Sequence, residues 1–175
     1  MSDLPRVTDI LRAVGLSLPP PGSASDLERA RRRGATVHAA IEGIVYGFDG
    51  PMTPEAAPYI DAYRKFVAES GFKAERAEFE VMHVAWGYQG HPDLLGWLLT
   101  KRIIIDAKTG DEAGVAYQLA GYRAAWNEQH PTEAVEAIAS LKLNDNGTYR
   151  FHEHDLAEAE RVWFAALTVY QVQGR

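Results

Sequence analysis

The chain contains no cysteine among its 175 residues, and this absence excludes several kinds of site. Disulfide bonds, cysteine-ligated iron–sulfur clusters and thiolate zinc sites all require cysteine side chains. A chain without cysteine also agrees with a reducing compartment such as the cytoplasm. We therefore expect no iron–sulfur cluster in this protein, and we expect a cytoplasmic location.

Long apolar runs are missing as well. No stretch approaches the roughly 20 apolar residues that a membrane-spanning helix needs. The first 22 residues lack the basic region followed by a long apolar stretch that marks a signal peptide. With 46% hydrophobic and 24% charged residues, the composition is that of one globular domain with no membrane partner.

An excess of positive charge is also absent, because the formal net charge is −6. Nucleic-acid-binding domains commonly carry a basic surface, so this balance argues against a nucleic-acid partner. Acids gathered to hold metal ions nevertheless lower the net charge of an enzyme that still contacts phosphates through local lysines and arginines. The charge therefore counts against nucleic-acid chemistry without excluding it.

The order of helix and strand patterns predicts one α/β domain. Residues 1–23 end in "LPPPGS", which blocks a helix, so we expect a lead-in segment followed by a single domain over 24–175. Caps and periodicity predict elements over these ranges: helices 26–46 and 54–70, strands 74–86, 94–98 and 102–108, a helix 112–128, strands 134–143 and 148–154, and a helix 156–173. This order implies a mixed central β-sheet flanked by helices.

The segment "RIIIDAK", residues 102–108, carries an apolar strand directly into two opposite charges. Alternate residues share a strand face, so Asp106 and Lys108 lie on the same side at the edge of a core. A hairpin with the preceding strand would bring Asp93 alongside Asp106. Two close carboxylates repel, and a divalent cation with oxygen ligands relieves that repulsion. A purely structural salt bridge between Asp106 and Lys108 is the alternative.

Four motifs resemble those of one enzyme superfamily. "HPDLLG" (91–96) followed by "IIIDAKTG" (103–110) resembles the signature of the PD-(D/E)XK nucleases. "YQLAGY" (117–122) resembles the Gln-xxx-Tyr motif of their RecB-like branch, and "RGATVHAAIEG" (33–43) resembles the helix that carries a metal-binding histidine there. That branch includes the RecB nuclease domain, CRISPR-associated exonucleases and phage recombination exonucleases. The resemblance implies a restriction-endonuclease-like core.

The resemblance also implies a set of roles for individual residues. It implies Mg²⁺ or Mn²⁺, as one or two ions, held by Asp93, Asp106, the backbone carbonyl of Ala107 and His38. Lys108 would orient the attacking water and offset charge on the phosphate. The helical pair formed by Gln118 and Tyr122 would line the site.

Other candidates are weaker. Glu80 is a further candidate metal ligand; Glu78 has the same expected orientation, and Glu80 is preferred because it is closer to the site in sequence. His83 and His91 are expected on the surface. Candidate contacts to DNA phosphates, for which a solvated basic face is the alternative, are Arg31, Arg32, Arg33, Lys101, Arg102 and Arg123.

The expected function is a metal-dependent deoxyribonuclease, a RecB-like exonuclease acting in DNA recombination, repair or phage DNA processing. Two alternatives stay open, namely a non-catalytic DNA-binding or accessory subunit that kept the fold, and an RNA- or structure-specific nuclease. Besides DNA, a second copy of the chain or a recombination or single-strand-annealing protein is an expected partner. The location would be the host cytoplasm for a phage-encoded chain.

Overall fold

The centre of the fold is a mixed five-stranded sheet in the order β1-β4-β5-β6-β7. The structure is a computed structural model, and it describes residues 4–17, 22–48, 50, 52–110 and 113–174. Only β5 and β6 run parallel, while the other neighbours are antiparallel. The bounds of these strands are Lys73–Ala77 for β1, Leu94–Leu98 for β4, Lys101–Lys108 for β5, Ala137–Leu143 for β6 and Tyr149–Glu153 for β7.

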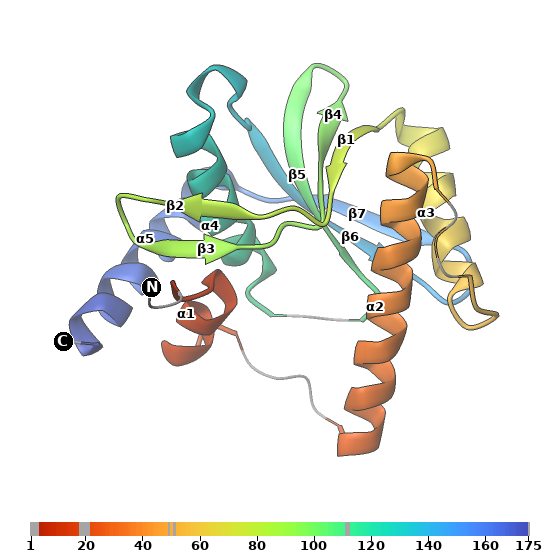
Figure 1. The fold of residues 1–175 in the computed structure, drawn as a ribbon, viewed down its shortest axis with the longest axis horizontal. Coiled ribbons are helices and arrows are strands. Elements are labelled where there is room, and N and C mark those ends of the chain that lie inside the picture. The colour runs from red at the N-terminus through yellow and green to blue at the C-terminus, as the bar shows by residue number, and fades with distance from the viewer. Residues whose placement is uncertain (1–3, 18–21, 49, 51, 111–112, 175) are drawn as a thin grey trace.

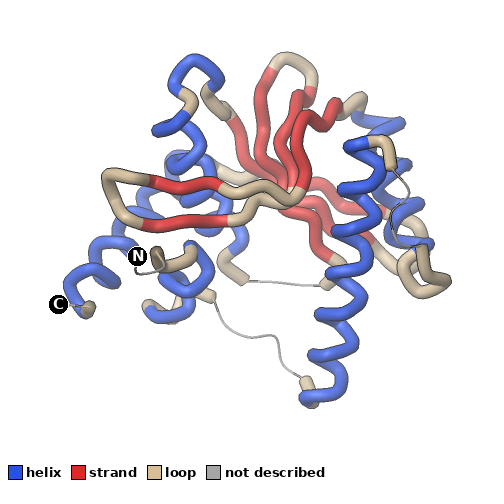
Figure 2. Tube along the Cα trace, viewed as in Figure 1, coloured by secondary structure: helices blue, strands red, loops and turns tan. Residues whose placement is uncertain are grey.

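Helices cover both faces of this sheet, as Figures 1 and 2 show. One face packs on α2 (Ala24–Tyr46) and α3 (Ala57–Ser70); on the other face α4 (Val115–Gln129) packs on the sheet, and α1 (Val7–Ala13) and α5 (Leu156–Gln173) pack against α4. The central strand β5 serves both cores, because Ile104 faces α4 and α5 while Ile103 and Ile105 face α2 and α3. This two-sided burial explains the continuous apolar run in its sequence.

Helices α2 and α5 begin at capping side chains, and α3 begins at Ala57, three residues after its expected start. Ser23, three positions before the expected start of this helix at residue 26, caps α2 by accepting a hydrogen bond from the Asp26 backbone N–H at 3.2 Å. Asp155 caps α5 through the N–H of Glu158 at 2.9 Å. The expected start of the helix at residue 112 lies outside the described residues, and α4 begins at Val115. Among the described residues, no helix is long and apolar enough to cross a membrane.

The N-terminal segment contains a helix that the sequence analysis did not predict. Val7, Ile10 and Leu11 of α1 are almost completely buried in the core formed with α4 and α5. A helix of seven residues is too short to show a clear periodicity, and it is stabilised here by burial of its apolar face. Of the "LPPPGS" segment, residues 18–21 lie outside the described residues.

The strand expected over 74–86 is wrong as a continuous element. The chain leaves β1 after Ala77, and Glu78 takes a left-handed backbone conformation with φ of 47°. A separate two-stranded hairpin follows, made of β2 (Val81–His83) and β3 (Tyr88–Gly90). Alternating hydrophobicity continues across the break, so a pattern of period two cannot reveal it. The consequence is that Glu78 and Glu80 do not share an orientation.

Candidate active site

Asp93 and Asp106 lie side by side at one end of the β4–β5 hairpin. The antiparallel register pairs Leu94 with Ile105, which brings the two flanking aspartates next to each other. Asp93 is 9% exposed and Asp106 is 1% exposed. The Asp93 Oδ2 atom accepts a hydrogen bond from the backbone N–H of Ala107 at 2.7 Å. The hairpin therefore holds two carboxyl groups together in a buried position.

The two carboxyl groups disfavour each other's ionisation. Burial, followed by the charge of Asp106, raises the pKa of Asp93, and the nearby cations His38 and Lys108 only partly oppose this shift. A buried carboxylate beside a second one is costly because little solvent screens the repulsion. Additional positive charge at this place would lower that cost.

Lys108 and two residues of α4 surround Asp106. The Lys108 Nζ atom lies 3.1 Å from Asp106 Oδ1, and Gln118 Nε2 donates a hydrogen bond to the same oxygen at 3.2 Å. Gln118 Nε2 also donates to the Tyr122 hydroxyl oxygen at 3.0 Å, one helical turn further along α4. Burial, followed by the charges of Asp106 and Asp93, raises the pKa of Tyr122, so its phenol stays neutral. These contacts fix the orientation of the Asp106 carboxylate.

His38 enters the site from α2. Its Nδ1 atom lies 2.8 Å from Glu78 Oε1 and 3.7 Å from Asp93 Oδ1, and its Nε2 atom lies 2.9 Å from the carbonyl oxygen of Ala107. Both ring nitrogens thus face acceptor oxygens, which suits the doubly protonated ring. Burial lowers the pKa of His38, but the charges of Asp93 and Glu78 outweigh it and raise the pKa to about 9. The raised pKa therefore favours the imidazolium form of His38 at neutral pH.

Three of these side chains converge closely enough to hold a metal ion. One ligand atom each from His38, Glu78 and Asp93 lies within 4.8 Å of the other two. The Ala107 carbonyl oxygen lies within hydrogen-bond distance of the same histidine, and Asp106 is adjacent to Asp93. Carboxylate and carbonyl oxygens with one imidazole form a donor set that suits Mg²⁺ or Mn²⁺.

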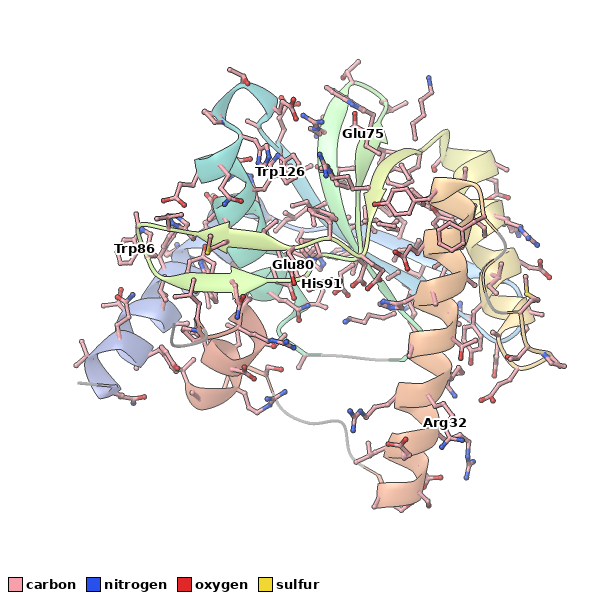
Figure 3. The ribbon with its side chains drawn as sticks, viewed as in Figure 1. Arg32, Glu75, Glu80, Trp86, His91 and Trp126 are labelled. Atoms are coloured by element: carbon pink, nitrogen blue, oxygen red, sulfur yellow. The ribbon has the colours of Figure 1, made fainter. Side chains whose placement is uncertain are left out.

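Glu78, and not Glu80, is the glutamate that reaches this cluster. The left-handed conformation at Glu78 turns its side chain toward His38, whereas Glu80 lines a separate cavity of about 240 Å³ with His91 and Tyr122. Figure 3 shows Glu80 and His91 near the base of the β2–β3 hairpin. The preference for Glu80 is thus corrected: nearness in sequence misled, because the chain bends between the two acids.

The two histidines expected on the surface differ from each other. His91 has a half-exposed side chain, and its Nε2 atom lies 3.3 Å from Glu78 Oε2, so it adjoins the cluster. His83 is buried, with its Nδ1 atom 3.0 Å from Glu128 Oε1. The position of His91, two residues before Asp93, could have indicated that it lies near the cluster. The expectation that His83 lies on the surface is wrong.

A cavity of about 690 Å³ opens between α2 and the end of β5. His38, Glu78 and Lys108 lie along its wall, together with Arg31 and Arg33 from the first half of α2. The Arg33 Nη2 atom donates to the carbonyl oxygen of Thr109 at 3.5 Å. Arg32 projects from the lower part of α2 and does not line this cavity (Figure 3).

The structure does not bring the remaining predicted basic residues to this cavity. Lys101 begins β5 at the end opposite Lys108 and pairs with Glu153 at 3.1 Å. Arg102 is paired with glutamates on both sides, and Arg123 pairs with Glu160 and donates to the carbonyl oxygen of Val135. These three side chains are engaged in structural contacts away from the aspartates.

Comparison with known proteins shows similarity at the level of structure alone. No protein-family model matches the chain, and no curated protein sequence matches it. Its structure is similar to that of a candidate exonuclease from Eubacterium rectale, with 10% identity and a TM-score of 0.51 over 94% of this chain and 71% of that chain. This similarity shows the fold, the α/β restriction-endonuclease-like core expected from the sequence.

Two further solved structures are similar more weakly. The exonuclease LHK-Exo of Laribacter hongkongensis in complex with dAMP has 14% identity and a TM-score of 0.44, over 97% of this chain and 89% of that chain. A phage-related exonuclease from Haemophilus somnus has 13% identity and a TM-score of 0.36, over 97% of this chain and 94% of that chain.

Proposed function

We propose that this chain is a metal-dependent deoxyribonuclease that hydrolyses phosphodiester bonds as a RecB-like exonuclease. The observation that carries the proposal is the meeting of two buried carboxylates, Asp93 and Asp106, with Lys108 at the end of one hairpin. The Eubacterium rectale protein that shares this fold is described as a candidate exonuclease, which supports the same activity. We place the process in DNA recombination, repair or phage DNA processing, within one nuclease domain over 24–175 that α1 completes.

The residues of the cluster fit a divalent cation. Asp93, Asp106 and the Ala107 carbonyl would hold it, with His38 and Glu78 as neighbouring ligands. When bound, Mg²⁺ or Mn²⁺ supplies positive charge for the phosphate oxygens and lowers the pKa of bound water. The fit rests on the oxygen-rich donor set and on the repulsion between the two aspartates, which a cation would relieve.

Lys108 and the residues of α4 have distinct roles in this proposal. Lys108 presents its ammonium group to the large cavity while in contact with Asp106, so it would orient the attacking water and offset charge that develops on the phosphate. Gln118 holds the Asp106 carboxylate, and the neutral phenol of Tyr122 accepts the second hydrogen of the same amide. Gln118 and Tyr122 act as positioning residues.

The ring nitrogens of His38 lie within hydrogen-bond distance of Glu78 and of the Ala107 carbonyl oxygen, and its raised pKa favours the protonated ring. An imidazole must lose a proton before it can ligate a metal. A cation would therefore compete with protons for His38, which makes metal binding dependent on pH.

The proposal is tested with end-labelled linear DNA and closed-circular DNA, incubated in EDTA, Mg²⁺ or Mn²⁺. Loss of linear DNA alone, dependent on metal, is the expected result, whereas cutting of the circle would indicate an endonuclease. An RNA substrate in parallel distinguishes a ribonuclease. No cleavage with any metal would contradict the proposal and favour a non-catalytic accessory subunit.

A further inference from the structure

A row of three basic residues crosses the sheet next to the active site. Lys108 on β5 is the register partner of Lys142 on β6, and Lys142 is the register partner of Arg150 on β7. All three line one cavity of about 150 Å³, so their side chains project from the same face. The row places positively charged side chains at neighbouring positions on three strands.

The adjacent positions on the same face, two residues along each strand, carry further polar groups. Ser140 on β6 is the register partner of both Asp106 on β5 and His152 on β7, and Ser140 and His152 line the cavity. The Ser140 Oγ atom lies 3.1 Å from His154 Nε2, and the rings of His152 and His154 meet edge to face at 4.7 Å. A hydroxyl and an imidazole thus accompany the three cations.

Among the described residues, no contact of Arg150 accounts for its charge. Its side chain is exposed, and across the described part of the chain it makes no ion pair and no side-chain hydrogen bond. Glu153, three residues further along β7, belongs to the opposite face and pairs with Lys101. A guanidinium at the rim of a cavity, with no carboxylate partner in the described part of the chain, can bind a phosphate through two parallel hydrogen bonds.

We propose that Lys142, Arg150 and His152 form a phosphate-binding subsite that adjoins the active site through Lys108. This inference rests on the proposed nuclease function and identifies where a second phosphate of the substrate lies. Lys108 lines both this cavity and the large one, so it connects the two. Neighbouring strands are about 4.8 Å apart, which places the backbone of Arg150 about 10 Å from that of Lys108. The subsite therefore extends the active site across β6 and β7.

Two sources of phosphate share this chemistry. The subsite takes either an internal phosphodiester of the strand being cut or the phosphate monoester at a strand end. Both present oxygens to the same cations, and a monoester carries the greater charge.

The test measures binding of fluorescently labelled oligonucleotides in EDTA, so that no cleavage occurs. We compare wild type with Arg150→Gln and Lys142→Gln, and use Arg64→Gln as the matched control because Arg64 is an exposed cation on α3. Loss of one phosphate contact is expected to weaken binding about 5–10-fold and to reduce the slope of log K against log salt by about 0.7–0.9. Arg150→Lys, which keeps the charge, is expected to restore most of the binding.

Oligonucleotides with a 5′-phosphate, a 3′-phosphate or only hydroxyl ends distinguish the two sources. A preference for one phosphorylated end that disappears in Arg150→Gln assigns the subsite to the monoester. If Arg150→Gln weakens binding equally for all three kinds of oligonucleotide end, the subsite is assigned to an internal phosphodiester. If Arg150→Gln and Lys142→Gln bind the oligonucleotides as tightly as Arg64→Gln does, the subsite is overturned, even if the wild type cleaves DNA. Conversely, a loss of binding in a protein that never cleaves would support the subsite and contradict the proposed catalysis.

Discussion

Replacing Asp93 with asparagine is expected to stabilise the metal-free protein while abolishing cleavage. Burial is the largest cause that raises the pKa of Asp93, and the charge of Asp106 is the second. The folded state therefore disfavours the ionised form of this carboxyl group. Asparagine has nearly the same shape, carries no charge, and its amide oxygen can still accept the hydrogen bond that Ala107 donates. Asp93→Asn therefore removes the repulsion and keeps the contact.

The expected gain is about 1–3 kcal/mol at pH 8, in the range found when buried ionic groups are replaced by neutral ones of similar volume. For a chain of this size, about 2 kcal/mol corresponds to an increase in Tm of roughly 4–8 °C. The amide also brings two hydrogens that need acceptors, which keeps the gain at the lower end of that range.

The dependence on pH has a definite sign. Because the folded state raises the pKa of Asp93, this group binds more protons in the folded than in the unfolded state between about pH 4 and the raised pKa. The wild type therefore loses stability as the pH rises from about 4 through the raised pKa, and the advantage of Asp93→Asn grows over the same window. Near pH 4 and below, the two proteins are expected to melt at similar temperatures.

The assay is thermal unfolding in EDTA from pH 4 to pH 9, followed by the same scans with Mn²⁺. Added Mn²⁺ is expected to raise the Tm of the wild type more than that of Asp93→Asn, because an asparagine oxygen is the weaker ligand. A variant that melts below the wild type in EDTA at pH 8 would refute the reasoning, since it would show that the Asp93 charge is favourable in the fold.

Three other predictions concern the same cluster. Lys108→Ala is expected to keep Mn²⁺ binding by calorimetry but to reduce the cleavage rate about 100–1,000-fold, and an unchanged rate would reduce Lys108 to a salt-bridge partner. Burial lowers the pKa of His38, but the neighbouring acids outweigh burial and raise this pKa to about 9. Mn²⁺ affinity is therefore expected to rise with pH up to that value, with release of about one proton on binding, which calorimetry in buffers of different ionisation enthalpy measures. An affinity that does not change with pH would exclude His38 as a ligand. A Cβ atom at Gly90 would collide with the Tyr122 ring. Gly90→Ala is therefore expected to displace Tyr122 and Gln118 and to slow cleavage on the order of 10–100-fold. Full activity of this variant would show that Gln118 and Tyr122 do not position Asp106.

Much of the fold could be predicted because its signals are local. Gly47 and Gly71 marked the ends of α2 and α3, Asp155 marked the start of α5, and the "NDNG" turn between β6 and β7 was visible in the sequence. The apolar run in β5 correctly indicated a strand covered on both faces. These features depend on neighbours in the chain, so a single sequence contains them.

The failures arose where the fold depends on distant packing or on one backbone angle. Helix α1 exists because Val7, Ile10 and Leu11 reach a core that includes α4 and α5, which lie more than 100 residues further along the chain. The left-handed conformation of Glu78 cannot be read from a glutamate in an alternating pattern, and it decides which acid meets His38.

The candidate site shows the same division. The pairing of Asp93 with Asp106 followed from the hairpin between adjacent strands, and the one-turn spacing of Gln118 and Tyr122 followed from helix geometry. The row from Lys108 to Lys142 and Arg150 was not predicted, because it requires the parallel register of β5 with β6 and the hairpin register of β6 with β7 at once. Registers between distant strands are properties of the folded sheet.

The central claim is that the Asp93–Asp106–Lys108 cluster hydrolyses DNA, and one comparison tests it most directly. Purified wild type and Asp106→Asn are incubated with end-labelled linear duplex DNA in Mn²⁺, after circular dichroism has shown that both are folded. We predict metal-dependent degradation by the wild type and a loss of at least about 1,000-fold in Asp106→Asn. Equal degradation by the two proteins, or none by the wild type with any divalent metal, would contradict the account.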